Sequence, residues 1–128
     1  MKLLLDTHAL LFWLYEPARL GSSALRKLSD RDNRVYWSVA SSWELAIKVG
    51  LGKLRLDGPV ERVIPAELLR NGFSLLPIEH HHVLVVATLP PIHGDPFDRL
   101  LIAQAQAEGL TLVSADPKVT AYGVPVLW

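Results

Sequence analysis

Residues 97–116, FDRLLIAQAQAEGLTLVSAD, decide the fold class of this chain. Phe97–Glu108 is the clearest helical stretch of the sequence, and Gly109 directly after it is a typical residue for a helix C-terminus. Thr111–Val113 is a short apolar run that predicts a buried strand, and Asp116 follows it after two residues. A helix followed at once by a buried strand is the repeating unit of a parallel α/β sheet.

The same alternation continues outward from this stretch. Further strands are predicted at Lys2–Leu5, Val35–Trp37, Phe73–Leu76 and Val124–Leu127, and further helices at Ala9–Tyr15, Ala24–Leu28, Trp43–Val49, Pro59–Leu69, His80–Leu89 and Asp116–Tyr122. Continuous apolar strands between helices predict a three-layer α/β/α fold with a short-stranded parallel sheet. No repeat or low-complexity linker divides the sequence, so we expect residues 1–128 to form a single domain.

Composition excludes several classes of protein. Hydrophobic residues make up 50% of the chain and charged residues 20%, with a net charge of zero, which excludes a disordered chain. The absence of cysteine excludes disulfides, zinc–thiolate sites and thiol nucleophiles. No apolar run approaches the roughly 18 residues of a membrane span, so we expect a cytoplasmic protein.

The charges are unevenly distributed along the chain. Residues 19–70 hold ten Lys and Arg against six acids, whereas residues 71–128 hold two against five. A basic half beside an acidic half suits a polyanion that is guided toward a carboxylate-lined site. Scattered, solvated charges account for the same counts equally well.

Three acids lie at or near the ends of predicted strands and helices, where α/β folds of this kind bind ligands. Asp6 directly follows the first strand, and Asp116 follows Thr111–Val113. Ligands of open parallel sheets bind at the carboxyl ends of the strands, so we expect these two carboxylates at one edge. Asp98, in the first turn of the helix before that last strand, joins them if the crossover brings the helix start to the same edge.

Glu44 is the fourth acid and lies in the middle of a predicted helix. It sits at the margin of an apolar stripe at helical spacing, formed by Trp43, Ala46, Ile47 and Gly50. From that margin the carboxylate either reaches inward to a site or pairs with Lys48 one turn later. The four tryptophans are expected to be core or interface anchors.

Each of the other acids also fits an ordinary structural role. Asp95 before Pro96 has the pattern of a helix N-cap, which leaves Asp98 as a first-turn acid that the helix dipole favours. Asp116 before Pro117 repeats the pattern, and Asp6 can cap the helix that follows it. Nearby hydroxyls are candidates for orienting the carboxylates, with capping as the favoured alternative for Ser41; they are Thr7, Ser38, Ser41 and Ser114.

Four carboxylates that converge need a counter-charge. An all-oxygen ligand set without cysteine suits hard ions, Mg²⁺ or Mn²⁺, and such ions commonly act on phosphates. A bound ion of this kind lowers the pKa of a water and stabilises charge on the attacking and leaving oxygens, which makes phosphodiester hydrolysis the natural reaction.

The histidines are less informative. His80, His81 and His82 open a predicted helix, and three successive helical residues point in three directions, so we do not expect them to share one ion. His93, in the loop before Asp95, is a candidate contact for phosphate or substrate. Neither a nucleophile elbow nor a phosphate-binding loop is present.

Four segments taken together resemble the PIN-domain family, and within it the VapC-like toxins of toxin–antitoxin pairs; they are Leu3–His8, Ser41–Lys48, His93–Ala105 and Leu112–Asp116. The resemblance implies a Mg²⁺- or Mn²⁺-dependent ribonuclease. The family's four catalytic and metal-binding acids fall on Asp6, Glu44, Asp98 and Asp116. Asp95 is an additional acid in an auxiliary or capping position, and Ser114 stands where the family usually has Thr.

The resemblance also implies partners. Toxins of this type are typically homodimers that a small antitoxin neutralises through a segment placed in a groove near the site. Two other functions remain compatible with the same residues. One is a non-catalytic PIN-like binding module, and the other is a structure-specific DNA nuclease, because metal-bound carboxylates do not distinguish RNA from DNA.

Overall fold

The computed structural model describes residues 1–128 and confirms the α/β/α architecture. Its five strands form one sheet in the order β3-β2-β1-β4-β5, with every neighbouring pair parallel. The strands are β1 (Lys2–Leu5), β2 (Arg34–Ser38), β3 (Ser74–Leu76), β4 (Thr111–Val113) and β5 (Val126–Leu127). Because all five run in one direction, their carboxyl ends share one edge of the sheet.

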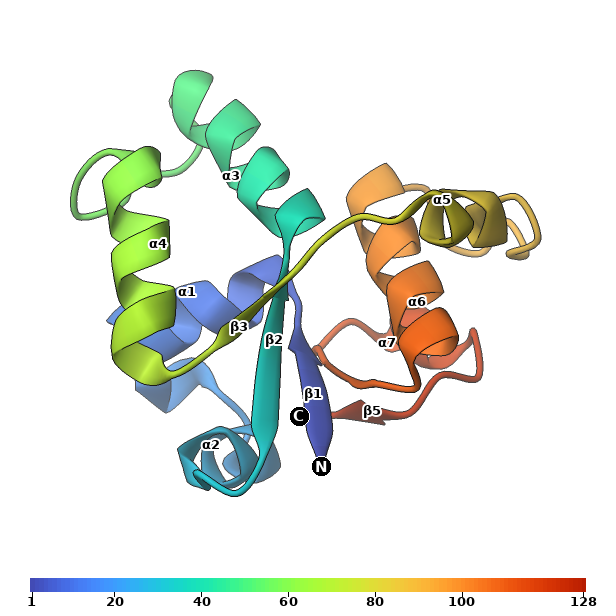
Figure 1. The fold of residues 1–128 in the computed structure, drawn as a ribbon, viewed down its shortest axis with the longest axis horizontal. Helices are drawn as coiled ribbons and strands as arrows, with labels where there is room; N and C mark the ends of the chain where they lie inside the picture. Colours follow the sequence, from blue (N-terminus) through green and yellow to red (C-terminus); the bar gives the residue numbers. More distant parts are fainter.

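Helices cover both faces of this sheet (Figure 1). One layer consists of α1 (Thr7–Tyr15), the 3₁₀ helix η1 (Pro17–Arg19), α2 (Ser22–Ser29), α3 (Val39–Gly50) and α4 (Val60–Asn71). The other consists of α5 (His80–Val86), α6 (Pro96–Glu108) and α7 (Pro117–Thr120). None of these helices combines the length and apolar content that crossing a membrane requires.

The central strand β1 is apolar on both sides because both of its faces are covered. Leu3 and Leu5 pack into the cluster beneath α1, α2 and α4, whereas Leu4 packs into the cluster beneath α6 and α7. All three side chains are fully buried. Successive residues of a strand point to opposite faces, so a doubly covered strand needs an unbroken apolar run.

Two helices begin earlier than predicted because a residue at the end of the preceding strand caps them. The Asp6 carboxylate accepts the Ala9 N–H at 2.7 Å, and α1 starts at Thr7 rather than Ala9. The Ser38 hydroxyl accepts the Ala40 N–H at 3.0 Å, and α3 starts at Val39 instead of Trp43. Ser41 therefore lies inside α3, and its predicted capping role is wrong.

Helix α5 ends at Val86, although the sequence predicted a helix as far as Leu89. The residue before a proline disfavours helical backbone, and Pro90 follows Leu89 directly. The Arg99 guanidinium of α6 donates to the carbonyls of Val86 and Leu89 at 3.2 and 3.3 Å. These carbonyls at the end of α5 are thus satisfied from a neighbouring helix.

The chain ends against the start of α2. The Ala24 N–H donates to the Trp128 carbonyl at 3.1 Å. A Cβ on Gly21, the N-cap of α2, would lie 2.3 Å from the Trp128 carbonyl carbon. Glycine is therefore required at this position by close backbone approach rather than by an unusual backbone angle.

Candidate metal centre

The four predicted acids come from four separate elements and gather at the carboxyl edge of the sheet. Asp6 lies between β1 and α1, and Asp116 between β4 and α7. In Figure 1 this edge lies between α3 and α6, which carry Glu44 and Asp98. The charges of Glu44 and Asp6 both act on Asp98, so the start of α6 has reached the same edge as the strand ends.

Glu44 points inward, with only 4% of its surface exposed. The Thr7 hydroxyl donates to its Oε1 at 2.5 Å, and Lys48 Nζ lies 2.7 Å from its Oε2. Both alternatives left open by the sequence therefore hold at once. The ion pair with Glu44 raises the pKa of Lys48, which keeps this ammonium charged beside the carboxylate.

The apolar stripe beside Glu44 lies on the outer side of α3. Trp43 is 59% exposed and Ile47 39% exposed, whereas Leu45 is fully buried. Trp43 is therefore not a core residue, and of the two predicted roles, core or interface anchor, the second stays a prediction for it. The side of α3 that faces the core therefore carries Glu44 and Leu45, whereas a simple amphipathic helix would turn the apolar stripe of Trp43 and Ile47 inward.

His93 bridges two of the acids. Its Nε2 lies 2.7 Å from Asp116 Oδ2 and 3.2 Å from Asp98 Oδ2. The Asp95 N–H donates to its Nδ1 at 3.1 Å, which leaves the proton of a neutral ring on Nε2, facing the carboxylates. The ligand atoms of His93, Asp98 and Asp116 all lie within 4.8 Å of one another.

Arg99 and Tyr122 hold this histidine in place, and sequence analysis did not identify either of them. The Tyr122 hydroxyl accepts the His93 N–H at 2.7 Å and Arg99 Nη1 at 3.1 Å. Arg99 Nη1 also donates to the Pro90 carbonyl at 2.9 Å. These contacts join residues up to 29 positions apart, so no local sequence pattern could predict them.

The remaining predicted groups divide into those that touch an acid and those that do not. Asp95 caps α6 as predicted, accepting the N–H groups of Phe97 and Asp98 at 2.8 and 3.1 Å. The Ser114 hydroxyl accepts the Asp116 N–H at 3.2 Å and hydrogen-bonds the Asp6 carboxylate.

Two of the four predicted hydroxyls therefore orient carboxylates, those of Thr7 and Ser114. The Ser38 hydroxyl donates instead to Gln104 Oε1. The buried Ser41 hydroxyl has no hydrogen-bond partner.

Burial and crowding of like charges perturb the pKa values of the acids. Burial, followed by the charges of Asp95, Glu44 and Asp6, raises the pKa of Asp98 to about 7, against the opposing charge of His93. Burial also raises the pKa of Asp6, partly offset by the hydrogen bonds from Ser114 and Ala9. At Asp116 burial acts in the same direction, but hydrogen bonds from the Lys118 N–H and His93 outweigh it and lower the pKa.

This donor set fits a hard divalent cation. Four carboxylates supply oxygen ligands, and Asp98 is a partly buried acid among like charges, which a cation would offset. The acids available to hold the ion are Asp6, Glu44, Asp98 and Asp116, with His93 beside the last two. Lys48 is the cation already present at Glu44.

A second cluster corrects the expectation about the histidine run. Nε2 of His82 and of His81 lie 2.7 and 3.3 Å from the same oxygen, Glu108 Oε1, so two successive histidines do converge. The Glu79 N–H donates to Nδ1 of the fully buried His82 at 2.9 Å. A neutral His82 then carries its proton on Nε2, which makes it a donor to Glu108 and opposes metal coordination there.

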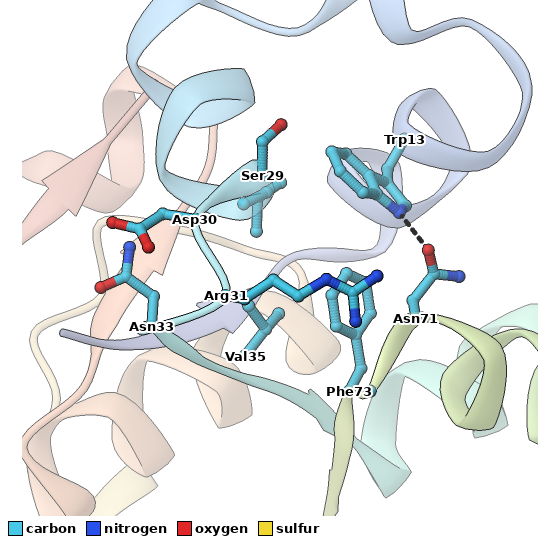
Figure 2. Close-up of a pocket in the computed structure, with 10 residues that line it drawn as sticks. Trp13, Ser29, Asp30, Arg31, Asn33, Val35, Asn71 and Phe73 are labelled. Carbon is cyan, nitrogen blue, oxygen red and sulfur yellow. Dashed lines mark hydrogen bonds between the residues drawn. The ribbon is translucent and has the colours of Figure 1, made fainter.

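A hollow of about 280 Å³ opens near the opposite edge of the sheet (Figure 2). Asn33 and Phe73 in its lining directly precede β2 and β3, so it borders the amino ends of these strands. Figure 2 shows Trp13 and Asn71 in its wall, joined by a hydrogen bond of 3.0 Å. None of the four acids lines this hollow, which separates it from the metal centre.

Comparisons with known proteins agree with this geometry. The PIN domain family model matches residues 3–124. Ribonuclease VapC22 of Mycobacterium tuberculosis is 30% identical over 125 residues, covering 95% of this chain and 92% of that protein. Ribonuclease VapC16 of the same organism is 35% identical over 68 residues, which span 50% of this chain and about half, 48%, of that protein.

The fold also matches a solved structure. A chain in the crystal structure of VapBC2 from Rickettsia felis, bound to a DNA fragment from their promoter, superposes with a TM-score of 0.76. The match covers 100% of this chain and 99% of that chain at 16% sequence identity. At this level of identity the likeness concerns the fold.

Proposed function

Because this chain belongs to the PIN domain family, we propose that it is a Mg²⁺- or Mn²⁺-dependent endoribonuclease and the toxin of a toxin–antitoxin pair. One observation carries the proposal. Four carboxylates, at the ends of β1 and β4 and on α3 and α6, gather at the carboxyl edge of a parallel sheet, where burial, followed by the charges of Asp95, Glu44 and Asp6, raises the pKa of Asp98 to about 7. The names of the two similar mycobacterial proteins support the ribonuclease activity.

In this proposal Asp6, Glu44, Asp98 and Asp116 hold the metal. A divalent ion held by these carboxylates would supply an activated water for attack on the RNA phosphodiester and a positive charge opposite the departing oxygen. The protein's own part is to keep the ligands oriented and close together before the ion and substrate arrive.

The auxiliary residues supply that orientation. Thr7 holds one oxygen of Glu44 and Lys48 the other, so this carboxylate cannot rotate freely. Ser114 hydrogen-bonds Asp6. Asp95 caps α6 and so places Asp98 in the first turn of that helix, and its N–H donates to Nδ1 of His93, which leaves the proton of a neutral ring on Nε2. That proton can be donated to a phosphate oxygen.

The proposed partners follow from the same site. RNA is the substrate, and the lysines and arginines of residues 19–70 bind its phosphates, which makes binding dependent on salt. A small cognate antitoxin neutralises the enzyme in the cytoplasm, and the toxin is a homodimer, as the resemblance to VapC-like toxins implies.

A cleavage assay tests the proposal. The purified chain is incubated with structured RNA, single-stranded RNA and single-stranded DNA, in EDTA, Mg²⁺ or Mn²⁺. The parent is compared with Asp98→Asn and with Asp32→Asn, which alters an exposed acid in the loop before β2. We expect RNA cleavage that needs the metal, disappears in Asp98→Asn and persists in Asp32→Asn.

Metal binding provides a second readout. Calorimetric titration with Mn²⁺ should show tight binding to the parent and at least tenfold weaker binding to Asp6→Asn and Asp98→Asn. Equal affinity in all three proteins contradicts the assignment of these ligands. Preferential cutting of DNA would establish the DNA nuclease instead, and metal binding without any cleavage would favour the binding module.

A further inference from the structure

Two aromatic residues stand directly beside the metal centre. Trp43 precedes Glu44 on α3, and Phe97 precedes Asp98 on α6. Their ring centroids lie 5.1 Å apart with the planes at 78°, an edge-to-face pair that joins the two helices. An aromatic contact therefore joins α3 and α6 directly beside Glu44 and Asp98.

Trp43 differs from the other tryptophans in its surroundings. The Trp37 ring is fully buried and donates its Nε1–H to Ser42, and Trp13 donates its Nε1–H to Asn71. Trp43 is 59% exposed, while its contact with Phe97 sets the position of the ring. A positioned indole with free surface is what a planar ligand requires for stacking.

We propose that Trp43, braced by Phe97, is the stacking platform for an unpaired base of the RNA, next to the phosphodiester held at the carboxylates. This inference rests on the proposed function and adds a residue that binds a base of the substrate. A nucleotide whose phosphate lies at Asp98 carries its base within reach of Trp43, because the Trp43 ring contacts Phe97, the residue directly before Asp98. Stacking on an aromatic face is the sequence-tolerant way in which proteins bind single strands.

The platform requires that the base be unpaired. Inside a duplex each base is already covered on both faces by its neighbours and has no surface free for the indole. Single-stranded RNA, or the loop of a hairpin, presents bases that can be splayed out. The Trp43 platform can therefore serve an unpaired segment of RNA and not a continuous duplex.

The test compares one oligoribonucleotide as a single strand and annealed to its complement, with Mn²⁺ present. Cleavage rates and KM are measured for the parent, Trp43→Ala, Trp43→Phe and Ile47→Ala. Ile47 lies one turn further along the exposed side of α3 and serves as the matched control. Sedimentation velocity is run on all four proteins to follow their association state.

We expect the parent to cut the single strand at least tenfold faster than the duplex. Trp43→Ala should raise KM for the single strand about fivefold or more, the effect of one lost base stack, and Trp43→Phe should restore most of it. Ile47→Ala should behave as the parent. Quenching of tryptophan fluorescence by the single strand should diminish in Trp43→Phe.

Two outcomes overturn the inference while leaving the nuclease intact. The first is unchanged KM and strand preference in Trp43→Ala. The second is an equal loss in Trp43→Ala and Ile47→Ala together with a change in sedimentation, which would make the outer side of α3 a protein interface. A parent that neither binds nor cuts either RNA overturns the proposed function and this inference together.

Discussion

His93 and Asp116 are 23 residues apart in the chain, yet Nε2 of His93 lies 2.7 Å from Oδ2 of Asp116. The contact depends on a hydroxyl from a third place in the sequence, because Tyr122 accepts the His93 backbone N–H. His93 is thus held at three places. Tyr122 accepts its backbone N–H, the Asp95 N–H donates to its Nδ1, and the carboxylates of Asp98 and Asp116 lie at its Nε2.

Tyr122→Phe should lower activity without removing any group that touches the metal or RNA. The hydroxyl accepts two hydrogen bonds, and its loss leaves the His93 N–H and one Arg99 donor unpaired. We expect a loss of about 1–3 kcal/mol in unfolding free energy and a decrease of about 10- to 100-fold in kcat, with KM nearly unchanged.

Tyr15→Phe is the matched control for Tyr122→Phe, since the Tyr15 hydroxyl accepts the Asp57 N–H at 3.1 Å on an exposed surface. It should leave kcat unaltered. If both variants lose activity equally, or if neither does, Tyr122 does not position His93.

Thr7→Val should weaken the enzyme through Glu44. The Thr7 hydroxyl is the donor to Oε1 of this buried carboxylate, and valine has the same shape without the proton. The variant should lose about 2 kcal/mol of unfolding free energy, since a buried charged acceptor loses a partner. Cleavage should fall about 10- to 100-fold, as for other groups that orient metal ligands.

Thr7→Ser keeps the hydroxyl and should recover most of the activity and stability. Chemical denaturation and initial cleavage rates measure the two effects. A serine variant as impaired as the valine variant would show that the methyl group, and not the hydrogen bond, is what matters at this position.

The metal-free protein should lose stability as pH rises, because the folded-state pKa of Asp98 is raised from 3.8 to about 7. A carboxyl with a raised folded pKa favours the protonated form in the folded state. Its stabilising contribution is complete below about pH 4 and is lost as the pH rises through about 7. In EDTA, Tm should therefore decline between pH 5 and pH 8.

Asp98→Asn removes this titration and should flatten the decline. Mn²⁺ should restore the Tm of the parent at pH 8, because the cation binds the ionised carboxylate, and should have little effect at pH 5. Parallel Tm profiles for parent and variant in EDTA would contradict the raised pKa.

Gly21→Ala should destabilise the fold where the start of α2 meets Trp128. The added Cβ would meet the Trp128 backbone at 2.3 Å, which requires the chain end or α2 to move. We expect a loss of about 1–3 kcal/mol in unfolding free energy.

Gly50→Ala is the control for Gly21→Ala. A Cβ at Gly50, the last residue of α3, meets nothing within 4 Å. It should be neutral or stabilise by up to about 1 kcal/mol. Thermal unfolding is measured for both variants. A lower Tm in Gly21→Ala alone shows that the close approach of Trp128 requires glycine at position 21, whereas an equal decrease in both would contradict this explanation.

The fold class and most capping groups were predictable because they depend on neighbours in the chain. The unbroken apolar run of β1 indicates a strand that is covered on both faces, as the structure shows. The Asp-Pro pairs at Asp95 and Asp116 cap the helices that follow them, as their local geometry requires. Helix ends were less predictable, because α5 ends at Val86, whose carbonyl accepts a hydrogen bond from Arg99, 13 residues further along the chain.

The acids at strand and helix ends could be predicted from short stretches of sequence, since a strand followed by a carboxylate is a property of a few adjacent residues. The inward direction of Glu44, the outward direction of Trp43 and the position of His93 between Asp98 and Asp116 depend on contacts between distant elements. The reason is physical. The direction of a side chain on a helix depends on the rotation of that helix against the sheet, and this rotation is set by contacts such as Thr7 with Glu44 that link residues 37 positions apart.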